Sequence, residues 1–508
     1  MSEDIEKKPA LESTNSSFDE DPISTTGEIK HAKQFTKFDK FAKVLKAEIR
    51  GVERVPENEK TDASLWSAAS MWLAANMVIS TFSLGALGVT VFALNFYQCL
   101  LIIIFFNFMG TSAVAFYCVF GAKFGLRQMI LSNFLVGVAG TKIFAFINLV
   151  ACIGWGSVNI MASAQLFHIV NNNALPPWAG CLILVICTVL VSFFGYNVIH
   201  TYEKFSWIPN LFVFIVIIAR MSMSGNFTPG EWATGRTGAG NVLSFGGTIF
   251  GFAAGWTTFA ADYTTYMPSN TNPYKIFFSV LAGLTTTLIF AMTLGAACAT
   301  GTLSDPAWAD LYNEFSIGGL VYAILVRKSL HGFGEFCCVL LGLSTVANNL
   351  PNMYSMALSA QAFSSYFRKI PRIFWTLFGN FVTLAICIPA YYEFAEVMHN
   401  FMNLIGYYLS IYIGMSVSEH VIYRKGFKGY NPEDYLDRSK LPIGIAGTIG
   451  FCFGLAGVIL GMNQTWYQGV LAHEIGDYGG DIGFELGMSF SFVAFNIVRP
   501  LEIKYFGR

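Results

Sequence analysis

Apolar residues are gathered along the chain into long stretches that short polar connections separate. A helix needs about 20 apolar residues to cross the hydrocarbon core of a membrane, and twelve stretches come close to or exceed that length. They cover residues 67–93, 96–121, 141–170, 178–200, 203–223, 241–262, 274–300, 331–357, 372–390, 394–422, 442–463 and 481–498. The pattern therefore predicts an all-α polytopic membrane protein with twelve transmembrane helices.

Charged residues are scarce and are concentrated at the N-terminal end. Residues 1–62 hold 14 acidic and 11 basic residues, whereas the whole chain of 508 residues holds 32 and 31. The rest of the chain is too poor in charge to cover a water-exposed surface, which excludes a soluble enzyme and a secreted disulfide scaffold. The net charge of −1 provides no basic field for a polyanion, so nucleic acid is excluded as a partner.

The N-terminal tail is the longest polar segment. Residues 1–20 contain no apolar run with a cleavage site, so no signal peptide is expected, and residues 1–30 have the composition of a disordered segment. Over residues 34–55, apolar residues at helical spacing alternate with lysines. This pattern predicts an amphipathic helix on the inner leaflet; a regulatory lid over the cytoplasmic mouth is the alternative.

Motifs for enzymatic or metal chemistry are absent from the sequence. The ten cysteines lie in apolar stretches without CxxC spacing, which is typical of small buried hydrophobic residues. No P-loop or HExxH run is present. We therefore expect neither an enzyme nor a metal or cofactor site.

Lys and Arg are distributed unequally between the two sets of connections. One set, together with the C-terminal tail, carries sixteen of them, and the opposite set carries only Arg220, Arg236, Arg327 and Lys328. Because positive charge is retained on the cytoplasmic side, both termini are expected to be cytoplasmic.

Two stretches contain glycine-rich runs, and these stretches are five apart in the order of the chain. The first holds Phe82–Gly88 and the sixth holds Gly246–Trp256. Unwound backbone in a membrane is tolerated only inside protein or beside a water-filled cavity, and inverted-repeat transporters break their helices at corresponding points of both halves. The spacing favours a five-plus-five inverted repeat of the LeuT type. Close helix packing at glycine is the alternative, and for Gly85 alone it is the simpler interpretation.

This interpretation divides the chain into five parts. They are a cytoplasmic tail (1–62), a first repeat (63–223), a second repeat (224–430), two additional helices (431–498) and a C-terminal cytoplasmic tail (499–508).

Polar and aromatic side chains stand at membrane depth in three of the stretches. Trp155 and Asn159 are four residues apart and share a helical face, and Asn348 and Asn349 precede Pro351 in an apolar run. A buried amide can bond a neighbouring helix, or it can match the donor–acceptor edge of a planar heterocycle. Trp155 and Trp256 provide faces on which such a ring can stack. Because no Lys or Arg lies at the midplane, we expect a neutral, planar, hydrogen-bonding ligand.

Intramembrane acids are candidates for carrying a coupling proton. Each acid of this kind lies near the end of a stretch, where an orientation towards the headgroups is the simpler interpretation: Glu203, Asp262, Glu335, Glu419 and Glu485. Ser344 and Thr345 could instead help to hold Na⁺ with a carbonyl of the first break. Since only these two hydroxyls are visible in the sequence, H⁺ ranks ahead of Na⁺.

Three runs of residues carry a resemblance to a known family. These runs are Glu48–Glu57 with the following Thr61-Asp62, Phe82–Gly88 and Asn348–Ser355. They resemble the fungal purine–cytosine permeases, which belong to the nucleobase–cation symporter family. The resemblance extends from about residue 35 to the C-terminus, and the Asn-Asn-x-Pro-Asn-x-Tyr-Ser run is its most specific part.

The resemblance implies a plasma-membrane symporter that imports cytosine and the purines adenine, guanine and hypoxanthine, driven by protons. It implies that these residues shape the substrate site: Ser83, Trp155, Asn159, Trp256, Asn348, Asn349 and Pro351. It also implies that Glu203 matches an acidic position linked to transport. Because a close relative in the family carries vitamin B6, a vitamin B6 symporter is the alternative. A nutrient sensor on the same fold and a channel rank behind it.

Overall fold

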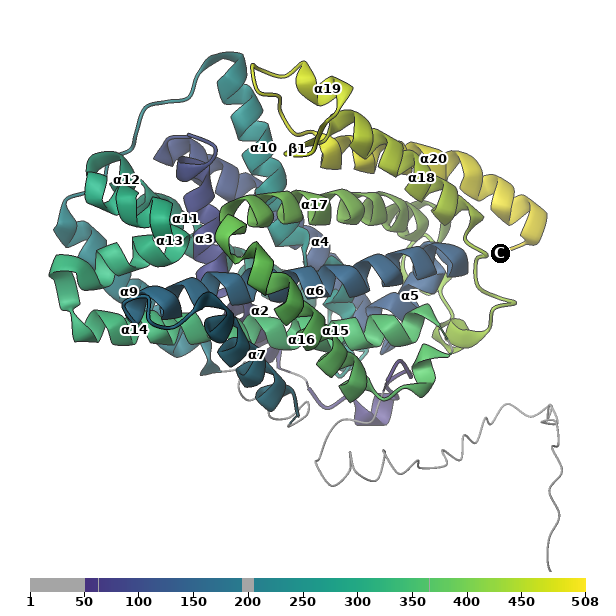
Figure 1. Ribbon diagram of the computed structural model, residues 1–508. Coiled ribbons are helices and arrows are strands. Elements are labelled where there is room, and N and C mark those ends of the chain that lie inside the picture. The colour runs from purple at the N-terminus through teal and green to yellow at the C-terminus, as the bar shows by residue number, and fades with distance from the viewer. Residues whose placement is uncertain (1–50, 63, 194–204, 365) are drawn as a thin grey trace, which may run out of the picture.

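The computed structural model describes residues 51–62, 64–193, 205–364 and 366–508, and this part of the chain is almost entirely helical (Figure 1). Its longer helices are α2 (Leu65–Asn76), α3 (Ile79–Thr90), α4 (Phe96–Phe124), α5 (Gln128–Leu135), α6 (Gly137–Val170), α7 (Pro177–Phe193), α9 (Trp207–Ser224), α10 (Gly235–Ala254), α11 (Pro273–Ala299), α13 (Pro306–Leu325), α14 (Gly332–Leu343), α15 (Thr345–Phe363), α16 (Arg372–Ala390), α17 (Phe394–Ser418), α18 (Ile445–Gly461) and α20 (Gly483–Phe506). Short elements are α12 (Gly301–Ser304), α19 (Val470–His473) and an antiparallel hairpin of β1 (Asn463–Gln464) and β2 (Tyr467–Gln468).

Each predicted stretch is occupied, within the described residues, by one helix or by two helices that meet at a break. Judged by length and apolar composition alone, eight helices of the described part can cross a membrane, or nine if the bent pair α2–α3 is one span. One of the eight is the segment Arg372–Tyr423, which contains both α16 and α17. Two further helices, in α7 and α18, are apolar but shorter. These differences account for the gap between eight or nine long helices and twelve predicted stretches.

Local sequence sets several helix ends. Asn95 and Gln98 form a reciprocal capping box at the start of α4, in which the Asn95 side chain accepts from Gln98 N at 2.8 Å. Gly125 ends the same helix in the left-handed conformation, with φ of 64°, which a glycine adopts without steric cost. The α11 helix begins at Pro273, and the side chain of the preceding Asn272 caps its N-terminus.

The first predicted span is broken, but earlier than its glycines indicated. The α2 and α3 helices are bent by 59° at Met77 and Val78, whereas the predicted run Phe82–Gly88 lies inside α3 and is helical. The prediction of a break is therefore confirmed and its position is corrected. The glycines of this run serve close packing instead, since a Cβ at Gly85 would lie 1.8 Å from the Met292 carbonyl oxygen of α11.

In the sixth predicted span, the α-helix is interrupted at the end of its glycine-rich run, where it gives way to a 3-10 helix without a bend as large as that of the first span. The α10 helix ends at Ala254, and after Gly255 and Trp256 the chain continues as the 3-10 helix η2 (Thr257–Tyr263). Gly251 packs backbone to backbone on α17, because a Cβ there would lie 1.9 Å from the Met402 carbonyl oxygen. One end of the run thus marks the break, and the rest allows helices to approach.

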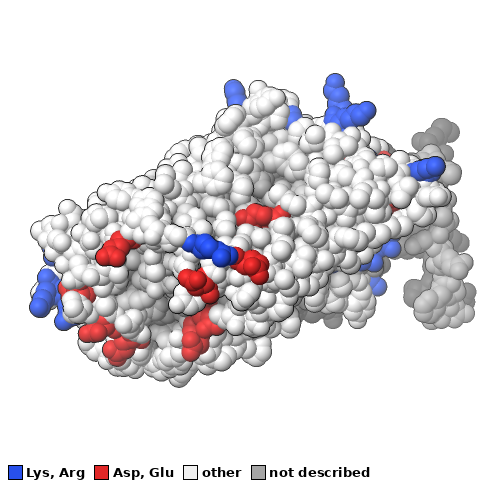
Figure 2. All heavy atoms as spheres, turned by 90° about the horizontal axis from the view of Figure 1, so that it is seen from above, with Lys and Arg blue, Asp and Glu red and all other residues white. Residues whose placement is uncertain are grey.

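The helices form one layered bundle around the two broken spans. In Figure 1, α6 crosses the centre beside α15, α17 lies above them, and α18 and α20 run side by side at one edge. The helices α12 and α13 lie at one end of the bundle, and α5 lies at the opposite end. Figure 2 shows a surface largely free of charged side chains, with the visible acidic ones gathered mainly towards one end. Exposed residues such as Phe105, Phe381 and Ile497 suit contact with lipid.

Two of the longer helices lie in connections for which the sequence predicted no element. The α5 helix follows α4 directly, and α13 occupies the connection before the eighth span. Asp310 and Glu314 interrupt the apolar pattern of α13, and Ser316 kinks it with φ of 50°. These interruptions explain why periodicity alone did not indicate this helix.

The described end of the N-terminal tail is extended and packs on the bundle. Residues 34–50 of the predicted amphipathic helix lie outside the described residues, and residues 51–55 are not helical. Val55 N donates to Gly125 O at 2.9 Å, and Glu57 accepts from Ser269 N at 2.8 Å. Partial burial raises the pKa of Glu57, but hydrogen bonds from Ser269 and Lys60 outweigh it and lower that pKa to about 2. The tail is thereby hydrogen-bonded to Gly125 at the end of α4 and to Ser269 in the loop before α11.

Candidate functional site

The break between α2 and α3 leaves backbone groups without partners in their own helices, and other spans supply them. Asn348 Nδ2 donates to the Ala75 carbonyl oxygen at the end of α2. Ile79 N at the start of α3 donates to Ser344 Oγ at 3.2 Å. Because unsatisfied backbone groups at membrane depth are costly, α14 and α15 stabilise the broken conformation of the first span.

Three of the predicted site residues form a buried cluster of amides. Asn159 Nδ2 on α6 donates to Asn348 Oδ1 at 2.7 Å and to Asn349 Oδ1 at 2.9 Å on α15. Ser80 Oγ on α3 donates to Asn159 Oδ1 at 2.6 Å. All four side chains are at most 1% exposed. The cluster therefore joins the first, third and eighth spans at the level of the first break.

The break in the sixth span meets the break in the first. Trp256 Nε1, at the end of α10, donates to Asn76 Oδ1 at 3.2 Å, directly before the bend of α2 and α3. The indole of Trp72 lies edge-on to that of Trp256, with 5.3 Å between ring centroids. The interruptions of the first and sixth spans are thus in direct contact through side chains beside them.

Trp155 lies against the break in the sixth span. A Cβ at Gly255 would lie 2.4 Å from its indole ring, so the missing side chain allows the ring to sit beside the backbone. Phe252 and Phe401 contact the same indole edge-on, at centroid distances of 5.2 and 5.5 Å. Trp155 and Trp256 are each 5% exposed. Gly255, on which Trp155 packs, directly precedes Trp256 in the chain.

The two remaining predicted site residues are placed differently. Ser83 lies in the first turns of α3, and its hydroxyl donates to Ile79 O of its own helix at 2.8 Å. Pro351 lies inside α15, and its carbonyl oxygen accepts from Tyr263 OH of η2 at 3.1 Å. Pro351 therefore ties the eighth span to η2 at the end of the sixth. Among the described residues, the Ser83 side chain makes no hydrogen bond to the amide cluster.

Sequence reasoning missed several residues of the site. Asn76 and Ser80 make the bonds that join the breaks and the amide cluster. Asn76 could have been found, because it is an amide deep in an apolar stretch, the feature that singled out Asn159. The roles of Trp72, Phe252 and Phe401 follow only from packing between spans.

Several buried polar atoms near the breaks have no hydrogen-bond partner among the described residues. They are Trp155 Nε1, Thr257 Oγ1 and Asn352 Oδ1. Buried polar groups are usually satisfied, so each exception calls for an explanation. Unpartnered donors and acceptors of this kind can bond a polar ligand.

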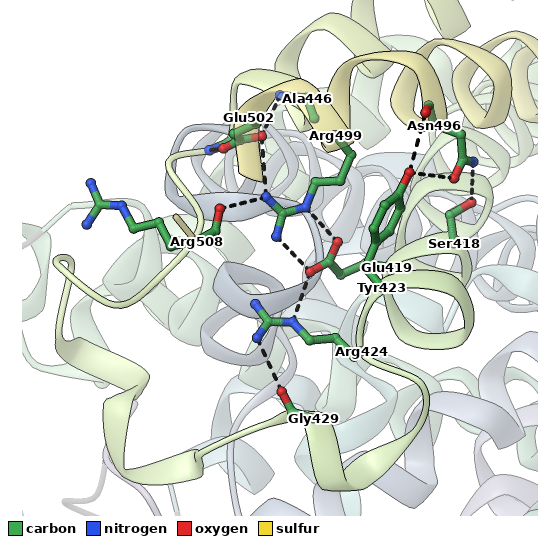
Figure 3. A network of polar contacts seen from close by, with 11 residues as sticks. Ser418, Glu419, Tyr423, Arg424, Gly429, Ala446, Asn496, Arg499, Glu502 and Arg508 are labelled. Atoms are coloured by element: carbon green, nitrogen blue, oxygen red, sulfur yellow. Dashed lines mark hydrogen bonds and ion pairs between the residues drawn. The ribbon is translucent and has the colours of Figure 1, made fainter. Parts of the chain in front are cut away.

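The acidic candidates are distributed away from this cluster. Asp262 at the end of η2 accepts from Gln128 N at 2.7 Å, and Glu335 and Glu485 are partly buried on α14 and α20. Glu419 is buried at the end of α17 and pairs with Arg499 at 2.8 Å and Arg424 at 2.9 Å (Figure 3). Glu203 lies outside the described residues. In the described part of the chain, the hydrogen bonds of the amide cluster involve no carboxylate.

The two hydroxyls considered for Na⁺ lie next to the first break. Ser344 Oγ accepts from Ile79 N at 3.2 Å and donates to Leu341 O. Thr345 Oγ1 lies 2.7 Å from Ser163 Oγ of α6. Both hydroxyls therefore contribute to holding the first and third spans against the eighth.

Comparison with known proteins gives consistent matches. Residues 54–472 match the family described as "Permease for cytosine/purines, uracil, thiamine, allantoin". The chain is 58% identical to the purine-cytosine permease FCY2 of Saccharomyces cerevisiae over 506 residues, which cover 99% of this chain and 95% of the relative. The vitamin B6 transporter TPN1 of Saccharomyces cerevisiae is 28% identical, over 91% of this chain and 88% of the relative.

A solved structure supports the fold. The structure of Mhp1, a nucleobase-cation-symport-1 family transporter, in a closed conformation with bromovinylhydantoin bound is similar with a TM-score of 0.62 and 16% identity. The match covers 91% of this chain and 95% of that one. At this identity, the likeness concerns the fold alone and confirms the predicted all-α transporter architecture.

Proposed function

The chain belongs to the family of permeases for cytosine and purines, uracil, thiamine and allantoin, and on that premise we propose that it imports cytosine, adenine, guanine and hypoxanthine by proton symport. The observation that carries the proposal is the meeting of two broken spans around a buried amide cluster. Broken helices at such a point serve transporters in binding a substrate and its coupling ion. An enzyme would need reactive groups there, and the residues of this cluster are amides, hydroxyls and indoles.

The base is proposed to bind between the two indoles. Trp155 packs on Gly255, directly before Trp256, so both rings border the break of the sixth span. Their faces can hold a planar heterocycle, and Asn159, Asn348 and Asn349 are proposed to define its edge. Ser83 and the backbone of the first span close the site, and Pro351 shapes the eighth span. Binding of base and proton would bias the change from the outward to the inward state through the different affinities of these ligands for the two states.

The coupling ion is proposed to be the proton, with Glu203 as its candidate carrier. Na⁺ is the competing ion, because the Ser344 hydroxyl lies at the first break, where it accepts from Ile79 N, and Thr345 follows it in the chain. The chain is proposed to reside in the plasma membrane with both termini in the cytoplasm, since the connections on one side carry most of the Lys and Arg.

The test is uptake of radiolabelled cytosine by permease-deficient yeast cells that express the full chain. Uptake is measured at two external pH values, with and without a protonophore, and with Na⁺ replaced by choline. We expect saturable uptake that rises at acid pH, collapses with the protonophore and does not depend on Na⁺. Uptake that requires Na⁺ and ignores the protonophore would contradict proton coupling.

A matched pair of variants connects this uptake to the site. Asn349→Ala is expected to raise the KM for cytosine about tenfold or more, because a buried hydrogen bond to the base is lost. Asn380→Ala removes a buried amide on α16 that donates to Thr376 O of its own helix at 2.9 Å and should leave the KM unchanged. If the unmodified chain reaches the surface without transporting any base, pyridoxine uptake tests the vitamin B6 alternative and its absence favours a sensor.

A further inference from the structure

We propose that a basic pocket at the α5 end of the bundle binds a phosphate group. The basic pocket has a volume of about 60 Å³, and its wall includes Lys142, Arg368 and Arg438. No residue of the amide cluster lines it among the described residues. The inference concerns a second ligand and stands apart from base transport, so each can fail without the other.

Three parts of the chain that are distant in sequence form the basic pocket. Lys142 lies in the second turn of α6. Arg368 lies in the 3-10 helix η4 (Phe367–Lys369) after α15, and Arg438 lies just after the 3-10 helix η8 (Pro432–Leu436). The α5 helix contacts α6, α15 and η8, and in Figure 1 these elements meet at the same end of the bundle. The three cations are therefore brought together only by the folded bundle.

The positive charge of the basic pocket is not neutralised by the described part of the chain. Among the described residues, no ion pair or side-chain hydrogen bond engages any of the three cations, and no carboxylate lines the pocket. The acids nearest to Arg438 in the sequence are bound elsewhere: Asp434 Oδ1 lies 2.7 Å from Lys440 Nζ, and Asp437 Oδ1 accepts from Ser439 N at 2.9 Å. Like charges that share a pocket repel each other, and a bound anion removes this repulsion.

Phosphate is the anion that suits these groups. A guanidinium donates paired hydrogen bonds to phosphate oxygens, and an ammonium adds a compact charge. The amide of Asn133 and the hydroxyl of Tyr435 also line the pocket, and these polar groups make no hydrogen bond within the described residues. A group with oxygen acceptors on several sides is thus matched by donors from several elements.

The size of the basic pocket agrees with this ligand. A single water needs about 10–15 Å³ of such space, so about 60 Å³ holds a group as large as a few waters. A phosphate group is of this size, and the rest of a larger ligand would extend from the mouth of the pocket.

A buried hydroxyl in the wall of the basic pocket is available to a ligand. Thr141 lines the pocket and is 2% exposed, and its Oγ1 has no hydrogen-bond partner among the described residues. Thr248 and Thr287, which also lie in helices, each bond the carbonyl oxygen four residues earlier. A helical threonine adopts either of two χ1 rotamers, so the Thr141 hydroxyl can turn towards a ligand without losing a bond to the protein.

The location favours a lipid headgroup as the source of the phosphate. The α5 end of the bundle is proposed to face the cytoplasm, and basic pockets between transmembrane helices on that side bind lipid headgroups. Phe363 and Leu436 line the same pocket, so apolar contacts for the glycerol part of a lipid lie beside the cations. Inorganic phosphate is the other source of the same chemistry.

The experiment measures binding of a fluorescent short-chain phosphatidylinositol 4-phosphate to the purified full chain in a neutral detergent, by fluorescence anisotropy. The competitors are the unlabelled lipid, short-chain phosphatidylcholine and inorganic phosphate. We expect displacement by the unlabelled lipid but not by phosphatidylcholine, whose own cation neutralises its phosphate. Displacement by the unlabelled lipid alone identifies the headgroup as the source, and equal displacement by inorganic phosphate identifies free phosphate.

Four variants connect this binding to the basic pocket. Lys142→Gln and Arg438→Gln should each raise the Kd of the probe about tenfold, because a hydrogen bond to a charged group is lost. Thr141→Val should raise the Kd by a similar factor. Without the probe it should not lower the melting temperature, because the hydroxyl that it removes has no partner in the described protein. Lys428→Gln is the matched control, since it removes an exposed positive charge from the same set of connections outside the pocket.

The outcomes are decided by the comparison of these variants. Absence of probe binding by the unmodified chain, or an equal rise of the Kd in Lys428→Gln, would overturn the proposal. An unchanged Kd in Thr141→Val would overturn the part assigned to its hydroxyl. Melting temperatures of all variants show whether a loss of binding reflects unfolding. The measurement requires no transport, so its failure leaves the proposed function intact, and a failure of cytosine uptake leaves the phosphate site intact.

Discussion

Gly85 on α3 and Gly295 on α11 lie where two helices approach each other backbone to backbone. A Cβ at Gly85 would lie 1.8 Å from the Met292 carbonyl oxygen, and a Cβ at Gly295 would lie 1.9 Å from the Phe82 carbonyl oxygen. Small residues allow helices in lipid to associate by close van der Waals packing. The two glycines thereby hold α3, the helix after the first break, against α11.

Gly85→Ala is expected to destabilise the protein. The neighbouring atom is a backbone carbonyl oxygen that cannot turn aside, so the two helices must separate, and overpacking of this kind costs about 1–3 kcal/mol. The measurement is the apparent melting temperature of the detergent-solubilised protein. It is determined by size-exclusion chromatography of samples that have been heated to increasing temperatures.

Gly332→Ala is the matched control for this substitution. A Cβ at Gly332, the first residue of α14, would meet no atom within 4 Å. Its melting temperature should equal that of the unmodified protein. An equal effect of both substitutions would show that close approach at Gly85 is not the cause.

At the scale of elements, α20 is tied to α17 by buried ionic groups (Figure 3). Glu419 at the end of α17 accepts from Arg499 Nε at 2.8 Å and from Arg499 Nη2 at 2.9 Å. Glu502, one turn beyond Arg499, accepts from Gly444 N at 2.8 Å and from Ala446 N at 3.0 Å at the start of α18. The carboxylates thus join three helices at one end of the bundle.

Glu419→Leu is expected to be strongly destabilising, because it leaves the guanidinium of Arg499 buried without its bidentate partner. Removal of one member of a buried pair costs about 3–5 kcal/mol. The double variant Glu419→Leu with Arg499→Met should recover much of this loss, since a well-packed apolar pair can replace a buried ion pair. Apparent melting temperatures of both variants provide the comparison.

An exposed ion pair serves as the control. Lys440 Nζ lies 2.7 Å from Asp434 Oδ1, and the Lys440 side chain is 57% exposed. Lys440→Met should change stability by less than about 1 kcal/mol. A loss in Glu419→Leu no larger than in Lys440→Met would contradict the role assigned to the buried pair.

At the scale of the whole molecule, the two ends of the bundle carry different charges. The helices α12 and α13 lie at one end, and α5 lies at the other. Asp305, Asp310 and Glu314 lie at or within α13, and Arg327 and Lys328 follow it, whereas Arg438 lines a pocket beside α5. With positive charge retained inside, the α5 end is expected to face the cytoplasm.

Cysteine labelling on cells tests this orientation. Asp310→Cys and Asp437→Cys each place a thiol at an exposed position, in a background from which Cys187 and Cys452, the natural cysteines that are not buried, have been removed. A membrane-impermeant maleimide should label residue 310 on intact cells and residue 437 only after permeabilisation. The reverse pattern would invert the orientation.

Much of the fold and part of the site could be predicted from the sequence, because their causes are local. Twelve apolar stretches each correspond to helices, since a membrane span needs a continuous apolar run whatever it packs against. Asn159, Asn348 and Asn349 were recognisable for a similar reason, because an amide at membrane depth is costly unless it has a partner.

Only the tertiary structure decided which groups meet. The glycines of Phe82–Gly88 and those of Gly246–Trp256 look alike in sequence, yet most of them pack on α11, α4 and α17, and the breaks lie at Met77-Val78 and Gly255-Trp256. The donors and acceptors at those breaks are satisfied by residues of other spans, such as Asn348, Asn76 and Ser344. Such pairings depend on the positions of several helices at once, which no single segment of the sequence encodes.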